Sequence, residues 1–83
     1  METRLAVIGI VIGKREAAAK LNELLHEYGQ YIIGRMGVPY HHKAVSVISI
    51  IIDAPQDAIN ALTGKLGMLA DVSAKTTYPP LPQ

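Results

Sequence analysis

The run KAVSVISIII, residues 43–52, is the strongest strand signal in the sequence because most of its residues are β-branched. Successive side chains of a strand point to opposite faces of the sheet. One face of this strand would carry Ile48 and Ile50, and the other Val47 and Ile51, so neither face is polar. A sheet with one solvated face normally alternates apolar and polar residues. The run therefore predicts a strand that is buried on both of its faces.

The run RLAVIGIVI, residues 4–12, repeats this pattern, with Ile8 and Ile10 on one face and Val7 and Val11 on the other. An apolar patch that a single chain leaves exposed usually marks an interface. We therefore expect a homo-oligomer, a dimer or a tetramer, that buries the second sheet face between subunits. The alternative is that these residues are present only for their strand propensity.

Two helices are expected between the strands. Residues 14–28 are mostly good helix formers with leucines on one face, and Gly29 is placed to end this helix. The segment 53–57 reads as a second helix start, with a proline near the first turn and acidic residues near the positive end. Leucines at helical spacing continue this helix until Gly64 or Gly67 ends it.

Two further strands complete the pattern. Residues 30–38 predict a strand weakened by Gly34 and Gly37, which indicate bulges or close backbone approach, and residues 71–77 alternate as a short strand. The order strand, helix, strand, strand, helix, strand predicts an α+β, ferredoxin-like βαββαβ fold. Its four-stranded antiparallel sheet would carry both helices on one face.

The chain is short enough to form a single domain, which we place at residues 1–78. Residues 79–83 form a proline-rich C-terminal tail that cannot continue a helix or a central strand. We expect this tail to be a loose end or an extension that lies along a partner.

Composition excludes several classes of site. The 83 residues include no cysteine, which rules out disulfides, thiolate metal sites and a nucleophilic cysteine. The eight basic residues are scattered and the net charge is +1, so direct nucleic-acid binding is not expected. No uncharged apolar run approaches the roughly 20 residues that a membrane helix needs. We therefore expect a cytoplasmic protein without a membrane segment.

Three segments carry a resemblance to a known family. They are NELLHEYGQYIIGRMGVPY (22–40), VSVISIIID (45–53) and AINALTGKLGMLADVSAKT (58–76). At this spacing the chain resembles the iron-only hydrogenase system regulator family, small proteins related to the ACT domains. The resemblance implies an ACT-like fold and a regulatory role connected with hydrogenase expression or maturation. The family is also similar to the C-terminal effector-binding domain of the nickel-responsive regulator, which assembles through its sheets into dimers and tetramers.

Arg35 is the leading candidate for effector binding. It interrupts an apolar strand beside small glycines, and its planar guanidinium suits a carboxylate or a phosphate. The competing interpretation is an ordinary arginine on an exposed strand edge. Tyr40, His42 and Lys65 are weaker candidates, which we expect with Arg35 at a subunit boundary.

A second candidate pocket follows from the resemblance. ACT-type domains use the turn between the first strand and the first helix, which here contains Gly13, Lys14 and Arg15. The glycine gives this turn a permissive backbone.

The histidines offer only a weak metal hypothesis. Neighbouring residues of an extended segment point to opposite faces, so His41 and His42 are poorly placed to bind one ion from one chain. His26 or a neighbouring subunit would have to complete the site. We predict no metal site and no cofactor, and keep these histidines as weak candidates.

Catalysis is not expected. Ser46, Ser49 and Ser73 lie in predicted strands without a base nearby in sequence, and no nucleophile, base and orienting group come together. The sequence therefore predicts a regulatory, oligomeric ACT-like domain that binds a small effector or a partner protein. The alternatives are a scaffolding oligomer without a ligand and a histidine-based metal sensor.

Overall fold

The structure is a computed structural model that describes residues 2–82. Residues 1 and 83, the outer ends of the predicted domain and tail, lie outside the described residues. The chain forms β1 (Arg4–Ile12), α1 (Glu16–Glu27), β2 (Ile32–Tyr40), β3 (Val45–Ala54), α2 (Gln56–Gly67) and β4 (Val72–Thr77), with short 3₁₀ turns η1 (Gly29–Tyr31) and η2 (His41–Lys43).

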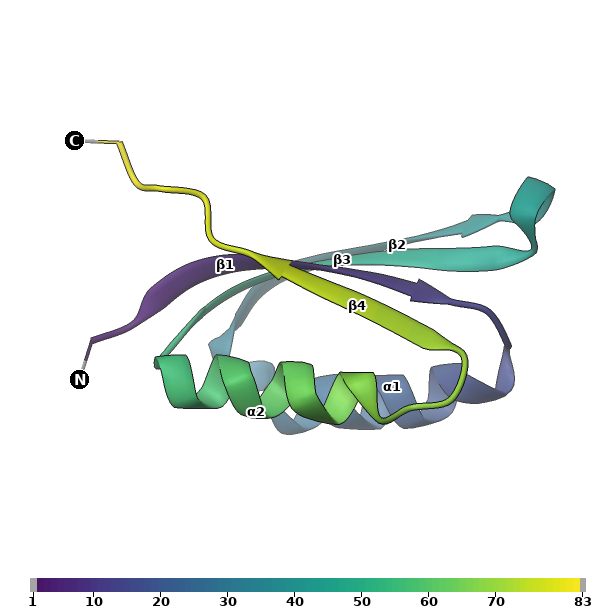
Figure 1. The fold of residues 1–83 in the computed structure, drawn as a ribbon, viewed down its shortest axis with the longest axis horizontal. Helices are drawn as coiled ribbons and strands as arrows, with labels where there is room; N and C mark the ends of the chain where they lie inside the picture. The colour runs from purple at the N-terminus through teal and green to yellow at the C-terminus, as the bar shows by residue number, and fades with distance from the viewer. Residues whose placement is uncertain (1, 83) are drawn as a thin grey trace.

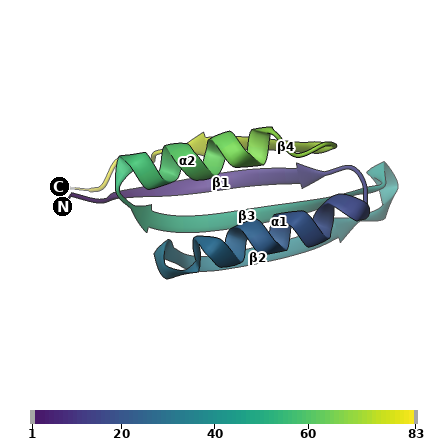
Figure 2. The ribbon, with the colours of Figure 1, turned by 90° about the horizontal axis from the view of Figure 1, so that it is seen from below.

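The strands form one antiparallel sheet in the order β2-β3-β1-β4. Both helices lie on the same face of this sheet (Figure 1). Seen from below, α2 runs beneath β1 and β4, and α1 runs beneath β2 and β3 (Figure 2). The predicted α+β, ferredoxin-like βαββαβ fold is therefore confirmed.

Element boundaries differ from the predicted ones by a few residues. Residues 29–31 form η1, so β2 begins at Ile32 rather than at residue 30. The bulge expected near Gly34 is present as a register shift between Ile32 and Gly34. Helix α2 continues through Gly64 and ends at Gly67, because a single glycine weakens a helix without breaking it.

The core lies between the helices and the sheet face turned toward them, which we call the inner face. The alternate residues of β1 and β3 that were expected to share a face point here and are buried, except that Ser46 is half-buried and Ala44 lies in the hairpin turn before β3. Full burial of one such side chain contributes about 1.5–3 kcal/mol. The core consists of Ala6, Ile8, Ile10, Ile12, Leu21, Leu25, Ile48, Ile50, Ile52, Ala54, Ile59, Leu62 and Leu66.

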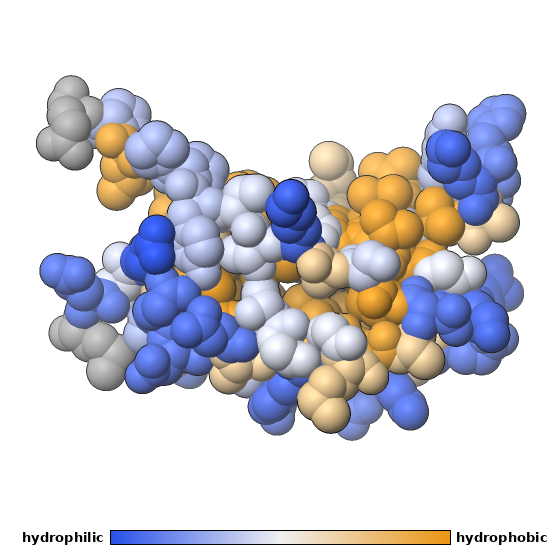
Figure 3. All heavy atoms as spheres, viewed as in Figure 1, coloured by the Kyte–Doolittle hydropathy of each residue, from blue (hydrophilic) through white to orange (hydrophobic). Residues whose placement is uncertain are grey.

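The opposite, outer face of the sheet is also apolar. Strand alternation and register place the following residues there: Leu5, Val7, Gly9 and Val11 of β1, Gly34, Met36, Val38 and Tyr40 of β2, Val45, Val47, Ser49, Ile51 and Asp53 of β3, and Ser73, Lys75 and Thr77 of β4. Met36 is 66% exposed, Val38 49% and Ile51 42%. Figure 3 shows apolar atoms on the side of the sheet away from the helices, continuing into the layer between the sheet and the helices. The prediction that β1 and β3 are apolar on both sides is therefore confirmed.

The tip of the β2–β3 hairpin differs from expectation. The histidines were placed in an extended connection, but they lie in the 3₁₀ turn η2, which bends away from the helices (Figure 1). Ala44 ends this turn in the left-handed region, with a φ of 54°. A side chain makes that backbone conformation costly, by about 1–2 kcal/mol.

Replacing Ala44 by glycine is expected to raise the free energy of unfolding by about 0.5–1 kcal/mol, because glycine adopts the left-handed conformation without the Cβ penalty. Urea denaturation followed by circular dichroism measures the change. The matched control is Ala61→Gly on the exposed side of α2, which should lower the same quantity by about 1 kcal/mol. Destabilisation by Ala44→Gly would contradict the backbone conformation described for the tip.

Candidate functional site

Arg35 lies on the helix side of β2, opposite the buried Ile50 of β3. Its Nη2 donates a hydrogen bond to Oδ1 of Asn22 in α1, at 2.9 Å. A hollow of about 370 Å³ opens between this strand and α1, lined also by His26 and Gly29. Among residues 2–82 the structure gives Arg35 no ion-pair partner. The guanidinium therefore keeps an uncompensated charge that a carboxylate or a phosphate would neutralise.

Lys65 lies in a different place, the groove between the two helices. Its Nζ is 3.5 Å from Oε2 of Glu27 and 5.1 Å from the centre of the Tyr28 ring. The Tyr28 side chain and, after it, the Glu27 carboxylate raise the pKa of Lys65 above its usual value of 10.5. Because both ends of the ion pair are exposed, we read it as a weak surface link between the helices.

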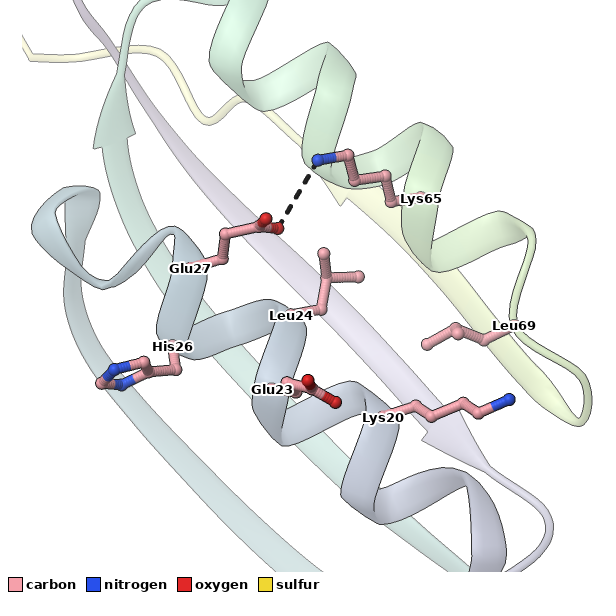
Figure 4. A pocket seen from close by; sticks show the side chains of 7 residues that line it. All are labelled: Lys20, Glu23, Leu24, His26, Glu27, Lys65 and Leu69. Carbon is pink, nitrogen blue, oxygen red and sulfur yellow. Dashed lines mark hydrogen bonds and ion pairs between the residues drawn. The ribbon is translucent and has the colours of Figure 1, made fainter.

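The interhelical groove has a volume of about 440 Å³ and a mixed lining. Figure 4 shows the side chains of Glu27 and Lys65 pointing toward one another, whereas His26 points away from α2. Leu24 and Leu69 supply apolar surface between the charged groups. Cations and carboxylates alternate here, so the groove offers no concentrated charge for a simple anion or cation.

Tyr40 and His42 lie together at the hairpin tip, with their ring centres 5.6 Å apart. His41 and His42 belong to a single 3₁₀ turn, so the expectation that they extend to opposite faces of a strand was wrong. Over residues 2–82, no group of three or more histidine, cysteine, aspartate and glutamate side chains is arranged to hold a metal ion.

The turn between β1 and α1 contains Gly13 and Lys14. The Gly13 N–H donates to the carbonyl oxygen of Asp71 at 2.7 Å, and Lys14 Nζ is 3.4 Å from the Asp71 carboxylate. Asp71 has a φ of 60°, which holds its carbonyl toward this turn. A hollow of about 360 Å³, lined in part by Met68 and Ala70, opens beside the ion pair.

The sequence-predicted site residues thus occupy four separate places. Arg35 lies on β2, Lys65 between the helices, Tyr40 and His42 at the hairpin tip, and the Gly13–Lys14 turn at the start of α1. His26 lines both the hollow of Arg35 and that of Lys65, whereas Lys20 and Leu69 line both the groove of Lys65 and the hollow beside Lys14. One pocket that contains all the candidates is not formed within the described chain.

A comparison with models of protein families shows to which family this chain belongs. The model of the TM1266-like iron-only hydrogenase system regulator family matches residues 4–76. The chain belongs to this family. The family's name describes a regulator rather than a catalyst, in agreement with the resemblance read from the sequence.

A member of known structure supports the family fold. The chain is similar to the uncharacterized protein TM1266 from Thermotoga maritima, with 33% sequence identity and a TM-score of 0.89. The similarity covers 93% of this chain and 98% of that one. No curated protein matches the sequence. Within residues 2–82, neither helix is long and apolar enough to cross a membrane.

The polar contacts that hold the tail were missed at the sequence level. Arg4 Nη1 donates to Gln56 Oε1 at 2.6 Å, and Gln56 Nε2 donates to the Tyr78 hydroxyl at 2.8 Å. The Arg4 guanidinium also lies 3.9 Å from the centre of the Tyr78 ring. Tyr78 therefore fixes the start of the tail, whereas Leu81 is 64% exposed. Arg4 and Tyr78 are far apart in the sequence and meet only because β4 pairs with β1, so no local spacing predicts this contact.

Proposed function

We propose that this member of the family is a regulatory domain of the iron-only hydrogenase system that acts as a dimer or a tetramer. The subunits associate through the outer face of the sheet, and the assembly binds a small effector or a partner protein. The observation that carries the proposal is the apolar outer face, which no element of the described chain covers.

The energetic argument for association rests on partly exposed side chains. Val11, Val38, Val47, Ile51 and Met36 are between 39% and 66% exposed. Removing apolar surface from water contributes about 25 cal/mol for each Å². Residues scattered over a surface need no cover, but these lie on adjacent strands as one patch. A second subunit is the simplest cover for such a patch.

The effector part of the proposal rests on Arg35. A guanidinium that donates to a neutral amide retains its full charge, and its remaining N–H groups stay available for an acidic ligand. The effector or the partner segment would therefore present a carboxylate or a phosphate to the hollow between β2 and α1. Binding there would contact both a strand of the oligomer-forming sheet and a helix.

Native mass spectrometry of untagged protein, purified without chelators, tests the proposal. We expect a dimer or a tetramer that retains a small acidic molecule, and we expect Arg35→Ala to lose that molecule while keeping its oligomeric state. Arg4→Ala, at an exposed arginine at the start of β1 and outside both candidate pockets, is the control that should retain it. A clean monomer would contradict the proposal, and an oligomer with no retained mass would favour the scaffolding alternative.

A further inference from the structure

The outer-face residues of β3 are arranged symmetrically about Ser49. Val45 and Asp53 each lie four residues from Ser49, which is about 13 Å along the strand in opposite directions. Val47 and Ile51 each lie two residues away. Ser49 pairs with Gly9 of β1, so the smallest outer-face residues of the two central strands share one row across the sheet. This row, which we call the central row, marks the middle of the apolar patch.

We propose that a second copy of this chain packs on the outer face with its strands antiparallel to those of the first, related by a two-fold axis along the central row. The inference rests on the proposed function, since it specifies how the oligomer is built. The axis places Val47 against the partner's Ile51 and Val7 against the partner's Val11. It also places Val45, at the base of the hairpin tip, over the partner's Asp53, so that Lys43 of the tip lies about 7 Å further along the strand, within reach of its long side chain.

Charge complementarity selects this arrangement. The strands place only Asp53 and Lys75 as charged residues on the outer face. The hairpin tip carries His41, His42 and Lys43, and it bends toward the outer-face side of the sheet (Figure 1). Within residues 2–82, neither Asp53 nor these tip residues have an ion-pair partner. In an antiparallel dimer, the tip of one copy lies near the Asp53 carboxylate of the other, so each charge gains an opposite charge.

The other face-to-face arrangement has its axis along the strands and brings the two basic tips together. Like charges placed side by side in an interface are unfavourable. In the arrangement that we propose, Lys75 lies at the β4 edge of the central row and approaches its own copy. Because β4 is an edge strand and Lys75 is exposed, the two Lys75 ammonium groups can remain in water there.

The backbone at the middle of the outer face also leaves room for a second copy. A Cβ built on Gly9 would meet no atom within 4 Å, so the backbone at the middle of the outer face is open to a close approach. Valine and isoleucine ridges rise on both sides of the central row, from β1 and β3.

Charge exchange tests the pairing. Asp53→Lys and Lys43→Glu should each weaken self-association roughly tenfold or more, because each change places like charges together twice in a two-fold dimer. The double variant Asp53→Lys/Lys43→Glu should recover the wild-type dissociation constant. Sedimentation velocity over a range of concentrations measures all of them.

Mixing distinguishes the pairing from a general effect on folding. A mixture of Asp53→Lys with Lys43→Glu should form heterodimers in preference to either homodimer, as seen by native mass spectrometry. If wild type instead formed heterodimers preferentially with Lys43→Glu, the two tips would have to face each other, and the antiparallel pairing would be overturned. Unchanged association of both single variants would also overturn it, with the oligomer itself intact. A wild type that stays monomeric at all concentrations would instead contradict the proposed function.

Discussion

Gly9→Arg is expected to convert the oligomer into a folded monomer. Gly9 is exposed at the middle of the outer face, and its backbone leaves space for a side chain in the isolated subunit. In the oligomer the new guanidinium would be stripped of water beside its own copy. An uncompensated charge at an interface costs several kcal/mol, so association should weaken on the order of a hundredfold or more.

Size-exclusion chromatography with light scattering measures the mass, and circular dichroism confirms that the variant is folded. Gly64→Arg is the matched control, because a Cβ at Gly64 also meets nothing within 4 Å but the residue lies on α2, away from the outer face. The control should associate like the wild type. If Gly9→Arg keeps the wild-type mass, the outer face is not the subunit interface.

Ile50→Ala is expected to remove about 2–5 kcal/mol from the free energy of unfolding, because Ile50 is completely buried in the core. A domain of 83 residues has a stability of only about 4–12 kcal/mol, so this variant should be near the limit of folding. The cost should be the same at every protein concentration. Its neighbour Ile51, on the outer face, provides the comparison.

Ile51→Ala is expected to cost about 1 kcal/mol or less in the isolated subunit, since Ile51 is 42% exposed there. Its larger effect should be on association, so its apparent destabilisation should grow as the protein concentration rises into the range where wild type associates. Urea denaturation at several concentrations separates the two variants. Equal, concentration-independent losses would show that one chain buries both faces of β3 by itself.

The fold could be predicted from the sequence because two repeating patterns dominate it, the alternation of the strands and the leucine spacing of the helices. The β-branched runs of β1 and β3 predicted the buried inner face, and the leucine spacing predicted the helix residues that pack against it, although Leu24 and Leu69 are only partly buried. The same runs predicted the apolar outer face. Boundaries were less accurate at η1 and η2, where short 3₁₀ turns depend on local backbone angles rather than on a repeating pattern.

The candidate site was harder to predict because it depends on which elements lie side by side. Arg35 was identified from its residue type, but its contact with Asn22 arises only when α1 packs beneath β2. Lys65 meets Glu27 across 38 positions of the chain, so no local spacing predicts that pair. Residue type therefore identified plausible ligand-binding side chains, but it could not predict that the fold places them on separate surfaces.

The most direct test of a buried outer face is NMR of the wild-type protein with a soluble paramagnetic agent, which broadens the signals of solvent-exposed methyl groups. If the outer face is covered by a second copy, the methyl signals of Val7, Val11, Val47 and Ile51 should be as protected as those of Ile8 and Ile50. Those of Met68 and Leu81, which are 86% and 64% exposed, should broaden. Broadening of the outer-face methyls to the same degree as Met68 would contradict association through this face.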